Sequence, residues 1–372
     1  MLTETEITEV FESSQSYLQL MKEADRITKA RHGNYITLER AIFLSWYCSL
    51  ASCAFCYMSA HGSKIDREKA KRAPWRILAE AELCRRAGWN IEFLSSGYGA
   101  LERQEIKQIA EMIAYTTHKA VWLNIGVLNE DELSFFGEEV EGVTGSIETL
   151  DSGIRSKIVP EKPVKPIRDM LINAKAQGFK TGITIILGLG ENLEAISNLL
   201  NFIDENDVDR VIFYSLNPHE GTEFENRASP ASLYHSRVVA ITRVSFPDIK
   251  IISGTWVDQL PSIGMNLLAG ANGITKFPLF SMFGNHLGKR VEQETKLANR
   301  KLLGTFSDWK VLKGEKELEE DRNPYALFNS RAPVVSRRAG ERVEYFRPRI
   351  DKAVKEYIAK AEEKSRRSKY SI

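Results

Sequence analysis

The chain has 372 residues, of which 43% are hydrophobic, enough for the core of a large α/β domain. Its 51 basic and 50 acidic residues leave a net charge of +1, which argues against nucleic acid or membrane as a partner. There is no signal-peptide pattern, and no apolar run approaches the roughly 20 residues of a membrane span. Four cysteines exclude a secreted disulfide framework, so we expect a cytoplasmic protein.

Residues 4–32 carry apolar positions at helical spacing, which predicts an N-terminal helix. After it, short apolar or β-branched runs alternate with charged segments of helical periodicity. The expected strands lie at 41–46, 91–95, 121–125, 143–147, 181–187, 210–215, 249–253 and 273–277. The expected helices lie at 66–87, 101–117, 164–177, 192–205, 231–245 and 257–268.

This alternation predicts an α/β fold in which helices cover a parallel sheet. Eight strands in about 250 residues suit a TIM-type (β/α)8 barrel, and an open doubly wound sheet is the competing architecture. We therefore expect an N-terminal helix in residues 1–35 and a barrel in residues 36–288. Residues 289–372 are expected to form a charged, helical C-terminal extension.

Three of the four cysteines lie within nine residues, in the stretch CSLASCAFC. Cys48, Cys53 and Cys56 follow the first expected strand, at the barrel end where such folds carry their active sites. Three thiolates can hold three irons of a [4Fe-4S] cluster and leave the fourth iron open to a ligand that is not protein. The alternatives are a zinc site completed by His61 and a CxxC redox pair, in which the third cysteine would be idle.

The segment CSLASCAFCYMS resembles the cluster loop of the radical S-adenosylmethionine (SAM) enzymes, with an aromatic residue directly before the last cysteine. Its C-x4-C-x2-C spacing has one residue more in the first gap than the usual pattern. Later segments resemble the biotin synthase-like branch of this superfamily, in the same order along the chain. They are LSSGYGAL (94–101), GSIETLDSGIRSKIVPEKP (145–163), ILGLGEN (186–192), YSLNPHEGTEF (214–224) and LLAGANGI (267–274).

The resemblance implies that the three cysteines hold a [4Fe-4S] cluster and that SAM binds its open iron. Glu148 would bind the SAM ammonium or ribose, and Arg168 would pair with the SAM carboxylate through a bidentate fork. Gly97 and Gly99 would let backbone carbonyls approach the ammonium. The implied SAM contacts are Phe55, Tyr57, Ser96, Gly97, Gly99, Glu148, Arg168, Gly188, Gly190 and Glu191.

Aromatic and hydrogen-bonding residues at the expected strand ends are candidates for the substrate space, because small polar ligands need both kinds of contact. Packing in the barrel core is the alternative role for each of them. These candidates are Tyr98, Trp122, Asn124, Tyr214, Asn217 and Trp256.

Biotin synthase and lipoyl synthase carry a second cluster that supplies sulfur, and this chain lacks the cysteines for one. The biotin synthase pattern places the second-cluster ligands near Leu94, Trp122, Gly182 and Thr255, and none of these residues can bind the iron of that cluster. Cys84 falls in an expected helix and is expected to be a small buried hydrophobic residue. The resemblance therefore implies a single-cluster enzyme that does not insert sulfur.

Among single-cluster families, the widened cysteine gap most resembles HmdB (HcgA), the methanogen family that accompanies [Fe]-hydrogenase. That implies a role in making the pyridinol of the iron-guanylylpyridinol cofactor. The alternatives are amino-acid rearrangement as in methylornithine synthase, other cofactor biosynthesis as in the maturase HydE, and a non-catalytic scaffold that binds cluster and SAM. The expected partners are a small-molecule substrate, a ferredoxin or flavodoxin as electron donor, and other cofactor-biosynthesis proteins, in an anaerobic cytoplasm.

Overall fold

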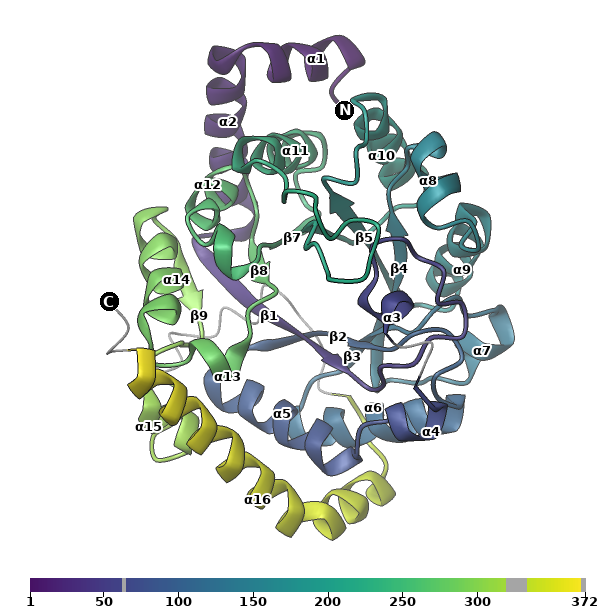
Figure 1. Ribbon diagram of the computed structural model, residues 1–372, viewed down its shortest axis with the longest axis vertical. Coiled ribbons are helices and arrows are strands. Elements are labelled where there is room, and N and C mark those ends of the chain that lie inside the picture. Colours follow the sequence, from purple (N-terminus) through teal and green to yellow (C-terminus); the bar gives the residue numbers. More distant parts are fainter. Residues whose placement is uncertain (62–64, 319–332, 369–372) are drawn as a thin grey trace.

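The computed structural model describes residues 1–61, 65–318 and 333–368. Eight parallel strands form a closed barrel with helices outside it, as predicted (Figure 1). Each strand pairs with the next, and β1 pairs with both β2 and β8, which closes the barrel. The strands are β1 (Tyr35–Phe43), β2 (Asn90–Ser95), β3 (Val121–Asn124), β4 (Val140–Glu148), β5 (Lys180–Leu187), β6 (Arg210–Ser215), β7 (Lys250–Gly254) and β8 (Gly273–Thr275).

Helices connect the strands and pack their apolar faces on the barrel wall. Gly88, in the left-handed conformation, ends the helix before β2, in accordance with its place in the sequence. The connecting helices are α3 (Tyr57–Ala60), α4 (Arg67–Ala70), α5 (Pro74–Ala87), α6 (Arg103–Thr117), α7 (Glu130–Ser134), α8 (Ser152–Ile158), α9 (Val164–Ala176), α10 (Glu194–Glu205), α11 (Ser232–Ser245), η2 (Val257–Gln259) and α12 (Ser262–Leu268).

Three segments predicted as single helices are interrupted, and one of them, at 257–268, consists of η2 and α12. The N-terminal one consists of α1 (Glu4–Glu12) and α2 (Ser14–His32), because Ser13 has an extended backbone and its hydroxyl caps α2. The segment predicted over 66–87 consists of α4 and α5. Pro74 begins α5, since proline lacks an N–H and suits the first turn of a helix.

The first strand also differs from the prediction, which places it at 41–46 although β1 spans Tyr35–Phe43. The charged pair Glu39 and Arg40 obscures its first half in the sequence. Glu39 is buried, and its carboxylate accepts a hydrogen bond from Lys250 Nζ of β7 at 2.5 Å. This pairing lets a charge lie inside the barrel.

The C-terminal part of the chain continues the barrel wall and then covers it. After β8 come α13 (Leu279–Met282), α14 (His286–Leu297) and β9 (Lys301–Leu303), which pairs in parallel with the start of β1. The predicted boundary between residues 288 and 289 falls inside α14.

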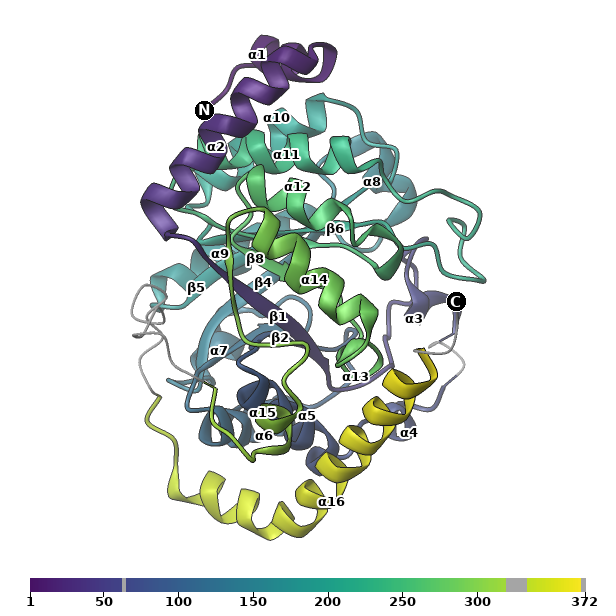
Figure 2. The same ribbon diagram turned by 90° about the vertical axis from the view of Figure 1, so that its left-hand side faces the viewer.

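Beyond β9, α15 (Trp309–Lys313) packs on α5, and α16 (Arg337–Ser368) packs on α5, α6 and α13. Helix α16 lies on the opposite side of the molecule from α1 (Figure 2). Its predicted basic tip extends into residues 369–372, which lie outside the described residues. In the described part of the chain, no helix has both the length and the apolar character that a membrane span requires.

The barrel interior can be tested at Ile212 of β6, which is fully buried against Trp122 and Ile252. We expect Ile212→Ala to lower the free energy of unfolding by about 2–5 kcal/mol, because the lost methyl groups leave a cavity. The control Ile172→Ala, on α9 with a side chain 52% exposed, should change it by less than about 0.5 kcal/mol. Urea unfolding followed by circular dichroism measures both, and equal midpoints would contradict the interior position of Ile212.

Candidate active site

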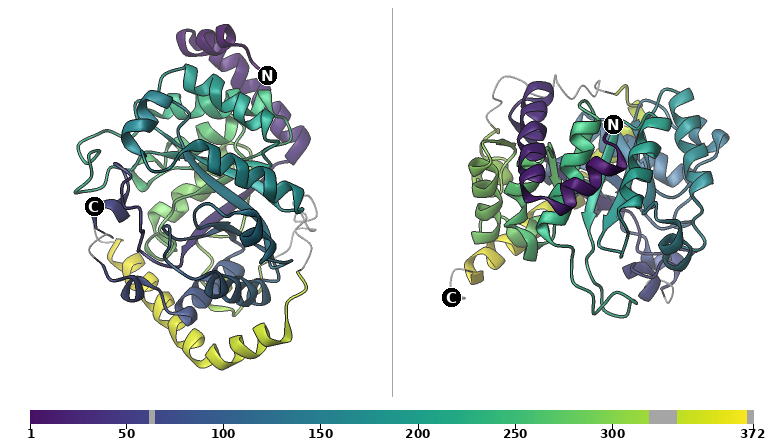
Figure 3. Two further views of the ribbon diagram at one scale, coloured as in Figure 1. Left: turned by 90° about the vertical axis from the view of Figure 1, so that its right-hand side faces the viewer. Right: turned by 90° about the horizontal axis from the view of Figure 1, so that it is seen from above.

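The loop between β1 and α3, here called the cysteine loop, is held by loops from three other strands. The Ser49 N–H donates to the carbonyl of Tyr98, after β2, at 2.9 Å. The Ala54 N–H donates to the Ile158 carbonyl at 2.9 Å, and the Ala54 carbonyl accepts from the Glu223 N–H at 3.2 Å. Viewed from above, α3 and the long loop after β6 extend from the same end of the barrel (Figure 3). The cysteine loop is therefore fixed at the carboxyl end of the strands.

Cys48, Cys53 and Cys56 are partly exposed free thiols, close enough that a charge on one affects the others. Burial raises the pKa of Cys53 to about 12. Burial also raises the pKa of Cys56, and hydrogen bonds from the backbone N–H groups of Met58 and Ser59 partly offset this increase. Among the described residues, no three Cys, His, Asp or Glu side chains form a preassembled metal-ion site. The donor set is thus three clustered thiols, which is the set that a [4Fe-4S] cluster with one open iron requires.

Gly97 sets the position of the first cysteine. A Cβ atom at residue 97 would lie 2.3 Å from the Tyr47 carbonyl oxygen and 2.4 Å from the Cys48 Cβ, so only glycine fits there. Gly99 has a φ of +63° and lies against Ser49. The structure thus gives both glycines a packing role against the cysteine loop, and their predicted contact with SAM stays a prediction, as does that of Ser96.

Glu148 ends β4 in a conformation that aims its carboxylate at a buried lysine. It follows a bulge in which Ile147 is the extra residue of β4, and its φ is +65°. Its Oε1 accepts a hydrogen bond from Lys162 Nζ at 2.7 Å, and both residues are more than 90% buried. Burial would lower the pKa of Lys162, but the charges of Glu148 and Cys53 raise it above its usual value. The sequence pattern alone does not identify Lys162 as a site residue.

Two arginines follow Glu148, and they have different surroundings. Arg155 is buried, and its guanidinium donates to the carbonyls of Ile147, Thr149 and Lys162. It therefore braces the loop after β4. Arg168 is exposed on α9 and has no hydrogen bond or ion pair within the described residues, so its role toward the SAM carboxylate stays a prediction.

The turn after β5 is stabilised by its own glutamate. The Glu191 carboxylate accepts from the N–H groups of Gly188 and Gly190, at 2.8 and 3.0 Å, and from the Tyr234 hydroxyl at 2.7 Å. Gly188 and Gly190 have φ values of +98° and +103°, which favour glycine. Glu191 thus has a structural role in this turn, and the predicted SAM contacts of the three residues stay predictions.

A cavity of about 860 Å³, here called the barrel cavity, lies inside the carboxyl end of the barrel. Phe55 and Cys56 of the cysteine loop and Tyr57, the first residue of α3, line it. Three of the predicted substrate contacts line the same space, namely Tyr214, Asn217 and Trp256. Its volume is in the range of small-molecule sites. The lining residues that sequence reasoning missed include Glu92, His219 and Lys276.

Trp122 is a correction, because it lies toward the other end of the barrel. Its ring stacks on the Arg210 guanidinium at 3.4 Å, and its Nε1 donates to the Glu141 carboxylate at 3.1 Å. It lines a second cavity, of about 1240 Å³, at the amino end of the strands. Trp122 is the second residue of β3 and does not line the barrel cavity.

Tyr98 and Asn124 do not line the barrel cavity either. The Asn124 Oδ1 accepts from the Ser146 hydroxyl at 2.9 Å, which joins β3 to β4. The Tyr98 ring packs on Gly126, where an added Cβ would lie 3.1 Å from it. Asn124 thus links two strands, and Tyr98 packs against the loop after β3.

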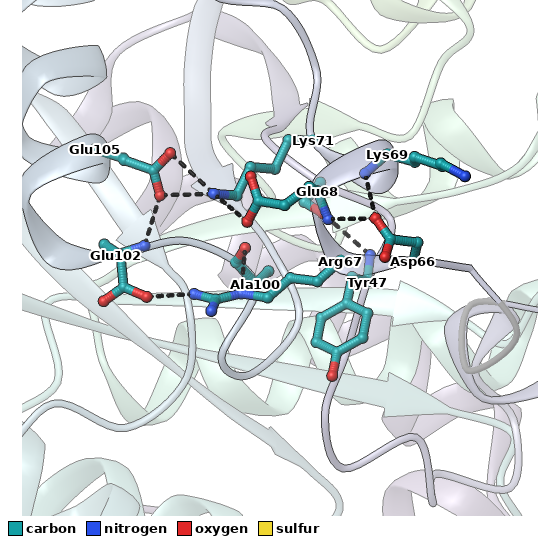
Figure 4. A network of polar contacts seen from close by, with 10 residues as sticks. Tyr47, Asp66, Arg67, Glu68, Lys69, Lys71, Ala100, Glu102 and Glu105 are labelled. Atoms are coloured by element: carbon teal, nitrogen blue, oxygen red, sulfur yellow. Dashed lines mark hydrogen bonds and ion pairs between the residues drawn. The ribbon is translucent and has the colours of Figure 1, made fainter.

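An ionic network fixes the rim of the barrel cavity (Figure 4). Lys71, which lines the cavity, has its Nζ 2.9 Å from Glu68 and 3.0 Å from Glu105. Arg67 pairs with Glu102 at 2.6 Å. The network joins α4, just after the cysteine loop, to the start of α6.

Comparison with known proteins gives one family. Residues 44–203 match the model of the Radical SAM superfamily. The uncharacterized protein MJ0597 of Methanocaldococcus jannaschii is 44% identical over 345 residues, which cover 92% of this chain and 94% of that protein. The 3-methylornithine synthase of Methanosarcina acetivorans is 25% identical over 268 residues, covering 71% and 75%. The crystal structure of methylornithine synthase (PylB) has a TM-score of 0.65 at 21% identity, covering 74% of this chain and 82% of that one, and supports the fold.

The contact of Gly97 with the cysteine loop predicts the effect of adding one methyl group. We expect Gly97→Ala to displace Cys48 and to reduce the iron retained after anaerobic reconstitution by at least about tenfold. Gly153→Ala on α8 is the matched control, because its Cβ would meet only the Asp151 carboxylate, at 3.4 Å. Iron analysis and the visible absorbance of both variants test this, and equal iron content would contradict it.

The buried pair of Glu148 and Lys162 predicts a double-mutant cycle. Removing one partner, as in Lys162→Met, leaves a buried charge and should cost about 3–5 kcal/mol of unfolding free energy. The double variant Glu148→Gln with Lys162→Met removes both charges and should recover most of that loss. Urea unfolding of the cluster-free protein measures the cycle, and additive effects would show that the two residues are not coupled.

Proposed function

Because this chain belongs to the radical SAM superfamily, we propose that it is a single-cluster enzyme that removes a hydrogen atom from a small substrate in the barrel cavity. The superfamily uses a [4Fe-4S] cluster and SAM, and Cys48, Cys53 and Cys56 are the residues that would hold the cluster. When bound, the two cofactors supply a 5′-deoxyadenosyl radical through reductive cleavage of SAM, with an electron from a ferredoxin or flavodoxin.

One observation carries this proposal. Phe55 and Cys56 of the cysteine loop line the same cavity as Tyr214 and Trp256 of the barrel. A radical formed at the cysteine loop would therefore be generated within the space that holds the substrate. The chain's own contribution is to orient the substrate and exclude water there.

Aromatic side chains form much of the wall that serves this purpose. The Phe43 and Trp46 rings stack with centroids 4.7 Å apart, and Trp46 meets Tyr57 edge to face at 6.3 Å. His219 contacts both Tyr57 and Trp256 edge to face. These rings join the cysteine loop to the loops after β6 and β7, so they cover the cavity from the side.

The surroundings of the fourth cysteine, Cys84, favour an enzyme with one cluster rather than two. Cys84 lies on α5 and is fully buried, with 0% of its surface exposed to solvent. Burial raises its pKa to about 12. It does not line the barrel cavity. Because Cys84 is the one thiol left for a second cluster, sulfur insertion from a sacrificial cluster is not part of the proposal.

The pathway is a finer proposal. The widened gap between Cys48 and Cys53 favours synthesis of the pyridinol of the iron-guanylylpyridinol cofactor, together with other cofactor-biosynthesis proteins. The relatives include methylornithine synthases, which favours amino-acid rearrangement as the competing reaction. Deuterium transfer from labelled lysine or from labelled pyridinol precursors into 5′-deoxyadenosine separates the two.

The cysteines provide the direct test of the class of reaction. After anaerobic reconstitution, the protein should hold about four irons per chain and convert SAM to 5′-deoxyadenosine under dithionite. Alanine at Cys48, Cys53 or Cys56 should reduce this activity to the level of cluster-free protein, whereas Cys84→Ala should retain it. A colourless protein with one zinc would contradict the proposal, and cluster and SAM binding without 5′-deoxyadenosine would favour a scaffold.

A further inference from the structure

Lys276 places an ammonium group in the barrel cavity without an anionic partner. It directly follows β8 and has a φ of +77°, a conformation that costs a residue with a long side chain. Its Nζ lies 4.3 Å from the centre of the Tyr214 ring and 5.5 Å from that of Trp256. Within the described residues, Nζ makes no hydrogen bond or ion pair. Two aromatic faces therefore hold the cation in place.

The surroundings of Lys276 make an anionic ligand favourable. The side chain is partly exposed, and because Lys276 lines the barrel cavity, that exposure is toward the cavity. Burial lowers the pKa of Lys276, although Glu92, Glu148 and Cys56 partly oppose the shift. A desolvated ammonium of this kind is stabilised by an anion brought into contact with it.

Glu92, the acid nearest in this part of the cavity, already has other partners. A bulge in β2 sets Glu92 and Phe93 opposite the single residue Ala41 of β1, which turns Glu92 into the barrel. The Tyr214 hydroxyl donates to one carboxylate oxygen, and the Thr275 hydroxyl donates to the other at 2.5 Å. Burial raises the pKa of Glu92, and the charge of Lys276 partly opposes that shift. Both carboxylate oxygens of Glu92 are thus occupied by hydroxyl donors, and no hydrogen bond or ion pair joins Glu92 to Lys276 within the described residues.

The other cavity cations are engaged elsewhere. Arg72 and Arg40 pair with Glu80, at 2.7 and 3.4 Å, and Lys71 belongs to the network at the rim. Lys69 also lines the cavity but is exposed at its edge. Lys276 is thus the cavity cation best placed to bind an anion deep inside the barrel.

We propose that the substrate of this enzyme carries a carboxylate that pairs with Lys276, with its carbon skeleton against the rings of Tyr214 and Trp256. This inference rests on the proposed function, because it assigns the occupant of the same cavity. A carboxylate matches a single ammonium, whereas a phosphate group commonly takes several N–H donors, from arginine forks or the start of a helix. The proposal makes Lys276 a specificity-determining residue.

Benzoate and benzamide are suitable probes, since they share a ring and nearly the same shape but differ in charge. Binding to the anaerobically reconstituted protein is measured by ligand-detected NMR. We expect benzoate to bind the wild-type protein at least about tenfold more tightly than benzamide. Lys276→Met should remove this preference, and Lys69→Met, the control at the rim, should keep it. Lys276→Asn gives a second neutral variant, with a residue that tolerates the left-handed backbone.

Equal binding of the two probes to the wild-type protein would overturn the inference, as would a benzoate preference that survives in both Lys276 variants. SAM cleavage under dithionite, measured on the same preparations, tests the proposed function separately. A protein that cleaves SAM without preferring benzoate loses only the carboxylate site. A protein that prefers benzoate through Lys276 without cleaving SAM keeps the anion site but is not the proposed enzyme.

Discussion

The closure of the barrel through β1 is the constraint on which the site depends. β1 is hydrogen-bonded to β2 on one side and to β8 on the other. Because all eight strands are parallel, closure brings every carboxyl end to one rim. The loop with Cys48 therefore lies next to the loop with Gly97, and the end of β8 brings Lys276 into the same cavity. Residues far apart in the sequence meet there without any long excursion of the chain.

Bulges in the strands then decide which polar groups enter the barrel. An extra residue in β2 turns Glu92 inward, and another in β4 precedes Glu148. Each buried acid meets its own compensation, which is two hydroxyls for Glu92 and the ammonium of Lys162 for Glu148. The interior is thus polar around Glu92 and Glu148, while its remaining walls are apolar and aromatic.

The sequence predicts the strands, their order and the cysteine loop because these follow from local signals, namely apolar runs, helix-ending glycines and clustered thiols. It does not predict Lys162 or Lys276, because the use of a lysine depends on partners distant in the chain. Glu92 offers a usable signal, since a charge in the middle of the apolar run IEFLS has to be compensated inside the fold. The sequence does not predict that Trp122 lies toward the amino end of the barrel, because the position of a residue along a short strand depends on register.

Three of the six non-glycine residues with positive φ in the described part of the chain lie at or near the site. Ala51 in the cysteine loop, Glu148 at the end of β4 and Lys276 after β8 are non-glycine residues with positive φ. Each conformation costs on the order of 1–3 kcal/mol and persists only where surrounding structure enforces it. At Glu148 and Lys276 the unusual backbone goes with a charged side chain directed into the protein rather than toward water. The structure therefore gives up part of its stability to hold the Glu148 carboxylate near Cys53 and Cys56 and the Lys276 ammonium in the barrel cavity. Fixed charges at defined positions are what selective binding of small charged molecules requires.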